Sequence, residues 1–147
     1  MTNSEKNFVT IGEFITIAVQ FEIDSAAFYR AMQPQVTQEN AREVLRLLEK
    51  EEVKHQEVLR KFDVGKDQHS LLQFPPSLSL SMPKMTTETP GLDEILNVGI
   101  AREQKTVEIY EHTAGMVSGQ FRELLTGLAN FERLHEEKLR SLKALLL

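Results

Sequence analysis

Two Glu-x-x-His pairs are the residues of this chain best suited to chemistry. Each pair is preceded by a lone Glu and by a Tyr that follows that Glu by seven residues. The first set is Glu22, Tyr29, Glu52 and His55, and the second set is Glu103, Tyr110, Glu132 and His135. Because carboxylate oxygens and imidazole nitrogens bind divalent transition metals, the two sets together predict a metal site.

The two sets are related by a nearly constant offset along the chain. The lone glutamates are 81 residues apart, whereas the paired glutamates and the histidines are each 80 residues apart. The chain therefore reads as a duplicated pair of helices in which the two loops differ by one residue. Four carboxylates and two imidazoles from four helices are the ligand set of a two-iron or two-manganese site.

The surroundings of the lone glutamates favour a buried metal site over a solvated helix face. Glu22 follows Phe21, and Glu103 follows Ile100 and Ala101. A carboxylate that faces a bundle core is costly unless it is paired or bound to metal. We therefore predict two metal ions, iron before manganese or zinc, with the ligands Glu22, Glu52, His55, Glu103, Glu132 and His135. A buried ion-pair network without metal is the alternative.

The two tyrosines and one further glutamate could support these ligands. Tyr29 and Tyr110 lie two helical turns after a lone Glu, on the same face. Each is either an ordinary core residue or a hydroxyl that bonds a ligand carboxylate from a neighbouring helix. Glu51 could orient a ligand histidine. Glu49 reads as a surface residue, because its counterpart in the second half is Ala129.

Four amphipathic helices account for most of the chain. Apolar residues recur at three- and four-residue steps in each, over about 10–32, 38–62, 91–116 and 118–146. Thr10 and Glu13 form the pattern of a capping box at the start of the first helix. Residues 63–90 hold four of the five prolines and are predicted to be a crossover without a long helix.

These elements predict a single domain, residues 1–147, of the all-α class. Two helical hairpins joined by a long crossover make a four-helix bundle. A helix of ~24 residues is ~36 Å long, a span that about 28 extended residues cover easily. We expect the crossover to run along the bundle and to start the second hairpin at the same end as the first. Its many Leu, Met and Phe residues should pack on the bundle or on a second subunit.

Composition excludes several other functions. The 147 residues carry a net charge of −5 without a basic cluster, which argues against nucleic-acid binding. The absence of Cys excludes disulfides, thiol nucleophiles and cysteine-ligated iron within this sequence. No apolar run approaches the ~20 residues of a membrane span, and the first residues do not resemble a signal peptide. A cytoplasmic location, with no membrane and no nucleic-acid partner, is the expectation.

At this point the residues resemble a known family. The segments FEIDSAAFYRAM, LEKEEVKHQEVL, AREQKTVEIYEHTA and FERLHEEKL are similar to the diiron domain of rubrerythrins, in the ferritin-like superfamily. The resemblance covers about residues 10–146 and implies a ferritin-like bundle with a carboxylate-bridged diiron centre. It implies that Glu22 and Glu103 are the ligands of the first and third helices, and that two of the four carboxylates bridge the metals.

Two departures from the rubrerythrin pattern matter for function. Rubrerythrins typically carry a rubredoxin-like domain that supplies electrons, and a sequence without Cys cannot form one. An external electron donor is therefore expected. The family also tends to carry a further carboxylate three residues after the third-helix ligand, where this chain has Thr106. Since that ligand accompanies peroxide reduction, its absence brings the site closer to the symmetric centres of bacterioferritin.

The sequence therefore predicts a diiron oxidoreductase that reacts Fe(II) with dioxygen or peroxide, as a peroxidase or as a ferroxidase. A non-catalytic iron-binding or iron-delivery protein uses the same ligands and is the alternative. The apolar crossover and the terminal leucines favour a homo-oligomer, most simply a dimer, with hairpin exchange through the crossover as a variant.

Overall fold

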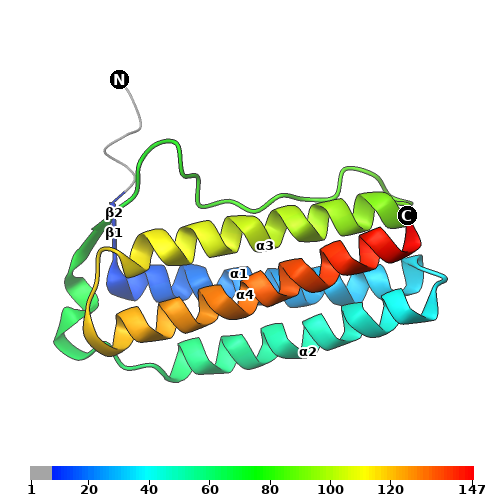
Figure 1. The fold of residues 1–147 in the computed structure, drawn as a ribbon. Helices are drawn as coiled ribbons and strands as arrows, with labels where there is room; N and C mark the ends of the chain where they lie inside the picture. Colours follow the sequence, from blue (N-terminus) through cyan, green and yellow to red (C-terminus); the bar gives the residue numbers. More distant parts are fainter. Residues whose placement is uncertain (1–7) are drawn as a thin grey trace.

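The computed structural model describes residues 8–147, which form a bundle of four long helices (Figure 1). The helices are α1 (Ile11–Met32), α2 (Glu39–Lys61), α3 (Leu92–Ala114) and α4 (Gly119–Leu146), joined by short elements named β1 (Phe8–Thr10), η2 (Gln33–Gln35), η3 (Gly65–His69) and β2 (Leu71–Gln73). Each helix begins and ends within one or two residues of the bound expected from the sequence. The all-α, four-helix architecture expected from the sequence is confirmed.

Local sequence signals explain where the helices start. The Thr10 hydroxyl accepts a hydrogen bond from the backbone N–H of Glu13, whose carboxylate accepts one from the N–H of Thr10, so the expected capping box is present. Gly119, the first residue of α4, has a φ of +67°. That left-handed conformation is costly for residues with a Cβ, and glycine therefore allows the sharp turn between α3 and α4.

The two hairpins are antiparallel to one another, which corrects one expectation. The crossover does run along the bundle, but α3 begins at the end opposite to the start of α1 (Figure 1). Contacts between the two helices show the same direction, because Tyr29 of α1 reaches Glu103 of α3 whereas Glu22 meets Tyr110. A hairpin returns the chain to its starting end, so a connection that runs the full length must deliver α3 to the other end.

The crossover packs on its own bundle. Strands β1 and β2 pair antiparallel, with Val9 opposite Leu72. Leu72 of β2, together with Phe74 and Leu78 beyond it, is buried in the hydrophobic core. The guanidinium of Arg102 in α3 is also buried and donates a hydrogen bond of 2.8 Å to the carbonyl oxygen of Pro83. These contacts hold the long connection against α1 and α3.

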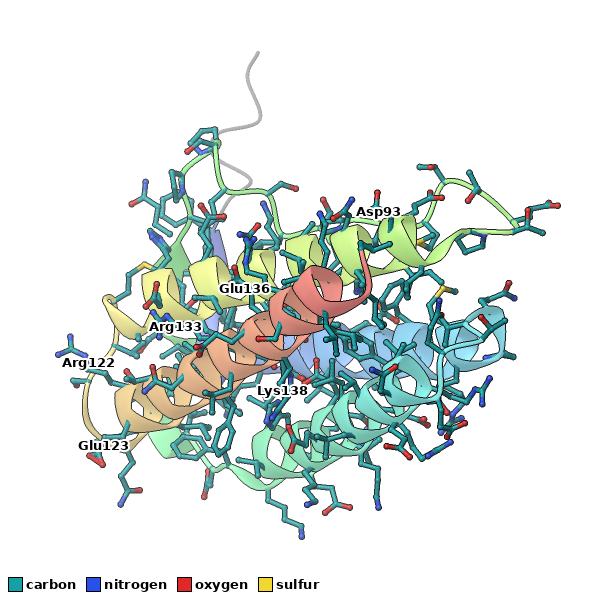
Figure 2. The ribbon with its side chains drawn as sticks, turned by 45° about the vertical axis from the view of Figure 1, so that its right-hand side comes forward. Asp93, Arg122, Glu123, Arg133, Glu136 and Lys138 are labelled. Carbon is teal, nitrogen blue, oxygen red and sulfur yellow. The ribbon has the colours of Figure 1, made fainter. Side chains whose placement is uncertain are left out.

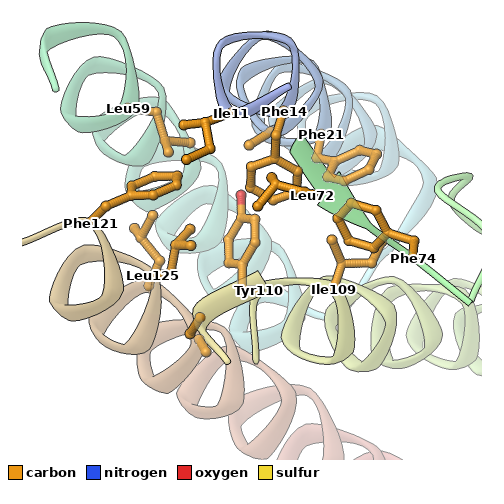
Figure 3. Packing of buried hydrophobic residues seen from close by; sticks show 14 of the residues in the cluster. Ile11, Phe14, Phe21, Leu59, Leu72, Phe74, Ile109, Tyr110, Phe121 and Leu125 are labelled. Carbon is orange, nitrogen blue, oxygen red and sulfur yellow. The ribbon is translucent and has the colours of Figure 1, made fainter. Parts of the chain in front are cut away.

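Two apolar clusters fill the bundle and flank its middle. The first includes Phe14, Phe74 and Tyr110 (Figure 3), with the rings of Phe14 and Phe74 stacked at 5.9 Å. The second includes Tyr29, Leu45, Leu48, Ile95, Leu96 and Leu139. Charged side chains such as Arg122, Glu123 and Lys138 cover the outside of α4 (Figure 2). None of the helices in residues 8–147 is apolar enough over a sufficient length to span a bilayer.

Candidate metal centre

All six side chains singled out as ligands meet between the two apolar clusters. Each lies near the middle of its helix: Glu22 in α1, Glu52 and His55 in α2, Glu103 in α3, and Glu132 and His135 in α4. All six residues are buried. Because the members of each Glu-x-x-His pair are three residues apart, one helix face carries both into the core.

Within these six residues the structure contains two overlapping groups of ligand atoms. Glu22, Glu52, His55 and Glu132 form one group, called here the Glu22 cluster; Glu52, Glu103, Glu132 and His135 form the other, the Glu103 cluster. In each group one ligand atom per residue lies within 4.8 Å of all the others. Since Glu52 and Glu132 belong to both clusters, they occupy the positions from which a carboxylate could bridge two cations. Glu22 and Glu103 could each serve one.

The histidines face these carboxylates through their Nδ1 atoms. His55 Nδ1 lies 3.1 Å from Glu52 Oε1 and 3.3 Å from Glu22 Oε1. His135 Nδ1 lies 3.0 Å from Glu132 Oε1 and 3.3 Å from an oxygen of Glu103. The two imidazole rings are almost parallel, with centroids 5.7 Å apart. The two clusters are thus arranged with approximate twofold symmetry, as the sequence duplication requires.

The two tyrosines hold the lone glutamates reciprocally. The Tyr29 hydroxyl donates a hydrogen bond of 2.5 Å to Glu103, and the Tyr110 hydroxyl donates one of 2.5 Å to Glu22. Next to the Tyr29 ring, Gly99 leaves room for Leu139, since a Cβ at position 99 would lie 3.1 Å from the Leu139 side chain but in ordinary contact, at 3.7 Å, with the Tyr29 ring. Both tyrosines are core residues and carboxylate partners at once, so the two interpretations of these residues are not exclusive.

Several polar atoms at the centre have no hydrogen-bond partner, because the ring nitrogens that approach them to 3.0–3.5 Å do so at angles unsuited to a hydrogen bond. In the part of the chain that the structure describes, they are both carboxylate oxygens of Glu52, Oε1 of Glu132 and Nδ1 of His135, and the only other such side-chain atom is Nε of Arg102. Buried polar groups in folded proteins are nearly always satisfied. Unsatisfied oxygens and an imidazole nitrogen that converge on one point are the atoms that metal coordination would satisfy, so this residue set fits a dinuclear site.

The pKa values of three buried carboxylates are shifted, in two opposite directions. Burial, together with the charges of Glu22 and Glu103, raises the pKa of Glu52 and of Glu132 well above the usual range. Burial also acts to raise the pKa of Glu22, but hydrogen bonding and charge from His55 outweigh it and leave that pKa lowered. The surroundings therefore favour the protonated form of the shared pair, Glu52 and Glu132, more than that of Glu22.

His135 and the tyrosines respond to the same negative charge. Burial alone lowers the pKa of His135, but the carboxylates of Glu103 and Glu132 overcome this effect and raise it to about 10. Burial and the adjacent carboxylates raise the pKa of Tyr29 and of Tyr110. Both hydroxyls therefore stay protonated and act as hydrogen-bond donors.

Three other residues that the sequence singled out lie as expected. Glu51 contacts one of the two histidines of the centre, and its partner is His135 of the other hairpin, at 2.7 Å. Glu49 binds Arg30 and Gln33 away from the centre. Thr106 is buried and donates a hydrogen bond of 3.0 Å to the carbonyl oxygen of Arg102, so no carboxylate stands at that position.

Arg102 is the buried residue that the sequence analysis missed. Its Nη2 lies 3.2 Å from Ser25 Oγ, and its guanidinium carbon lies 5.4 Å from the centre of the Phe28 ring. An arginine directly before a predicted ligand looks like a surface residue, because nothing in the local pattern shows that the crossover will cover it.

Comparisons with known proteins agree with this geometry. The model of the Rubrerythrin family matches residues 13–143, and the chain therefore belongs to the rubrerythrin family. It is a ferritin-like protein of the diiron-carboxylate fold, with a buried cluster of Glu and His residues that suggests a dinuclear metal site.

Solved structures show the same fold. One is described as a candidate ferritin-like diiron-carboxylate protein from Thermotoga maritima, with a TM-score of 0.77 and 18% identity over 94% of this chain and 97% of that one. Another is a hypothetical protein from Pyrococcus furiosus, with a TM-score of 0.67 and 24% identity over 93% of this chain and 90% of that one. No curated protein matches the chain.

Proposed function

We propose that this protein is a diiron oxidoreductase that uses dioxygen or peroxide as the oxidant. The observation that carries the proposal is the pair of overlapping clusters that share Glu52 and Glu132, with unsatisfied buried oxygens at their common point. Two ferrous ions bound there would supply the electrons that reduce the oxidant. Carboxylate and imidazole ligands suit iron, and also manganese or zinc.

The surrounding residues would prepare this centre for reaction. Tyr29 and Tyr110 hold Glu103 and Glu22 in place by hydrogen bonds. The apolar clusters on either side exclude water, which strengthens electrostatic interactions inside the site. Glu52 and Glu132 would help to hold both cations, whose positive charge would favour the ionised form of these buried carboxylates.

Thr106 helps to distinguish ferroxidase function from peroxidase function. With a hydroxyl in place of a seventh ligand, the two clusters carry the same ligand types, one lone Glu and one His each. This symmetry supports Fe(II) oxidation in the manner of a ferroxidase over dedicated peroxide reduction. Since these 147 residues hold no Cys for a rubredoxin-type centre, the electrons for catalytic turnover would come from outside them.

A protein that binds or delivers iron without turnover would use the same six residues. The two functions differ in whether oxidant is consumed beyond the bound metal. Anaerobically iron-loaded protein, mixed with excess Fe(II) or a chemical reductant, should consume many equivalents of dioxygen or peroxide per site. A matched Glu132→Gln variant should consume none above background. Consumption that stops at the bound iron would support the delivery function.

A further inference from the structure

The outer ring nitrogens of the two histidines have different surroundings. His135 is fully buried, and its Nε2 lies 2.7 Å from Glu51 Oε1. Because an ionised carboxylate can only accept, Nε2 carries the hydrogen of this bond. The lone pair of the neutral ring is then on Nδ1, the atom that faces Glu132 and Glu103.

His55 lacks such a partner. Its Nδ1 faces Glu52 and Glu22, but in residues 8–147 no carboxylate pairs with its Nε2. The ring of Phe131 lies beside it, at a centroid distance of 5.7 Å. The side chain of His55 is 8% exposed, whereas that of His135 is 0% exposed.

The sequence duplication shows that this difference is a single substitution. Phe131 follows Glu51 by 80 residues, the same offset that relates the two paired glutamates and the two histidines. Glu51 and Phe131 are therefore equivalent positions, and each faces the histidine of the opposite hairpin. One half of the repeat has a carboxylate where the other half has a phenyl ring.

We propose that Glu51 is a positioning residue that makes the two metal positions unequal, so that the Glu103 cluster binds the first divalent cation and the Glu22 cluster binds the second, more weakly. This inference rests on the proposed dinuclear function. A carboxylate on the outer nitrogen of a ligand histidine fixes its tautomer and ring orientation and increases its basicity, and the loss of such a partner typically lowers metal affinity by about 10- to 100-fold. The Glu103 cluster has this support and the Glu22 cluster does not.

Titration of the metal-free protein with Co(II), followed by visible absorption in the presence of a competing chelator, tests the order of binding. The wild type should bind two ions in resolved steps. His135→Ala should remove the tighter step, and His55→Ala should remove the weaker one. Two equal steps, or the opposite assignment, would overturn the inference.

Variants at the two equivalent positions test the cause. Glu51→Gln should weaken the tighter step by about 10- to 100-fold, whereas Phe131→Glu should tighten the weaker one. Glu57→Gln, an exposed change on the same helix, should alter neither. Glu51 and Phe131 are 31% and 53% exposed, so both substitutions should leave the fold intact.

The outcomes separate this inference from the proposed function. A wild type that binds no Co(II) would overturn both. A wild type that binds two ions, together with a Glu51→Gln variant whose two affinities stay within about twofold of it, would overturn the role of Glu51 and leave the dinuclear site standing.

Discussion

Replacing Glu52 by Met should stabilise the metal-free protein while it abolishes the dinuclear site. Glu52 is 0% exposed, and neither carboxylate oxygen has a hydrogen-bond partner. A buried polar group without a partner costs about 1–3 kcal/mol, and Met removes this group while it fills a similar volume. For a chain of this length, 1 kcal/mol shifts the melting temperature by about 2–4 °C. The expected rise is therefore roughly 2–12 °C.

Urea and thermal denaturation, each with chelator and with excess metal, measure both effects. Metal at 1,000 times its Kd stabilises a one-site protein by about 4.1 kcal/mol. The order of stability should then reverse, with the variant above the wild type in chelator and below it in metal. A metal-free variant that is less stable than the wild type by 1 kcal/mol or more would refute the claim that the buried Glu52 side chain destabilises the metal-free protein.

Glu49→Met is the matched control for this experiment. Glu49 lies one turn earlier on α2, with its side chain 16% exposed and its carboxylate 2.6 Å from Arg30 Nε. Loss of such a surface ion pair should change stability by about 0–1 kcal/mol, in the destabilising direction. Metal stoichiometry should remain that of the wild type.

Three further results are expected. Tyr29→Phe and Tyr110→Phe should each lower metal affinity by about 10- to 100-fold and the free energy of unfolding by ~1 kcal/mol. Unchanged metal affinity in competition titrations would contradict the role of these hydroxyls as hydrogen-bond donors to Glu103 and Glu22. Arg102→Met should speed tryptic cleavage after Lys84 several-fold at unchanged metal stoichiometry, because the guanidinium holds the adjacent crossover carbonyl; equal cleavage rates would argue against that anchor. Neighbouring carboxylates overcome the effect of burial and raise the pKa of His135 to about 10. The protonated histidine therefore stabilises the metal-free protein fully below about pH 6.5, and this contribution is lost as the pH rises towards 10. Melting temperatures measured in chelator should fall over that range, whereas the increase in melting temperature on adding metal should grow, because bound protons become easier to displace.

The clustering of the six candidate ligands could be predicted because it follows largely from local spacing. A three-residue step places Glu52 and His55 on one helix face, and the duplicated pattern makes coincidence improbable. The helix boundaries could also be predicted from the sequence, since Thr10 and Glu13 form a capping box that depends only on neighbouring residues.

Long-range contacts could not be predicted in the same way. That Glu51 reaches His135 rather than its own helix neighbour His55 depends on the antiparallel placement of the two hairpins. The burial of Arg102 likewise depends on where the crossover lies, because its partners are Ser25 and the carbonyl of Pro83. These pairings follow from packing between segments that are far apart in the sequence.

Metal stoichiometry per chain tests the central claim most directly. The protein should be loaded anaerobically with Fe(II), desalted and analysed for bound iron, and its absorption should be followed as dioxygen or peroxide is added. About two irons per chain, with a new near-ultraviolet band on oxidation, are predicted for the wild type. Retention of no iron, or of iron that gives no spectral change with either oxidant, would contradict the assignment of a redox-active dinuclear centre.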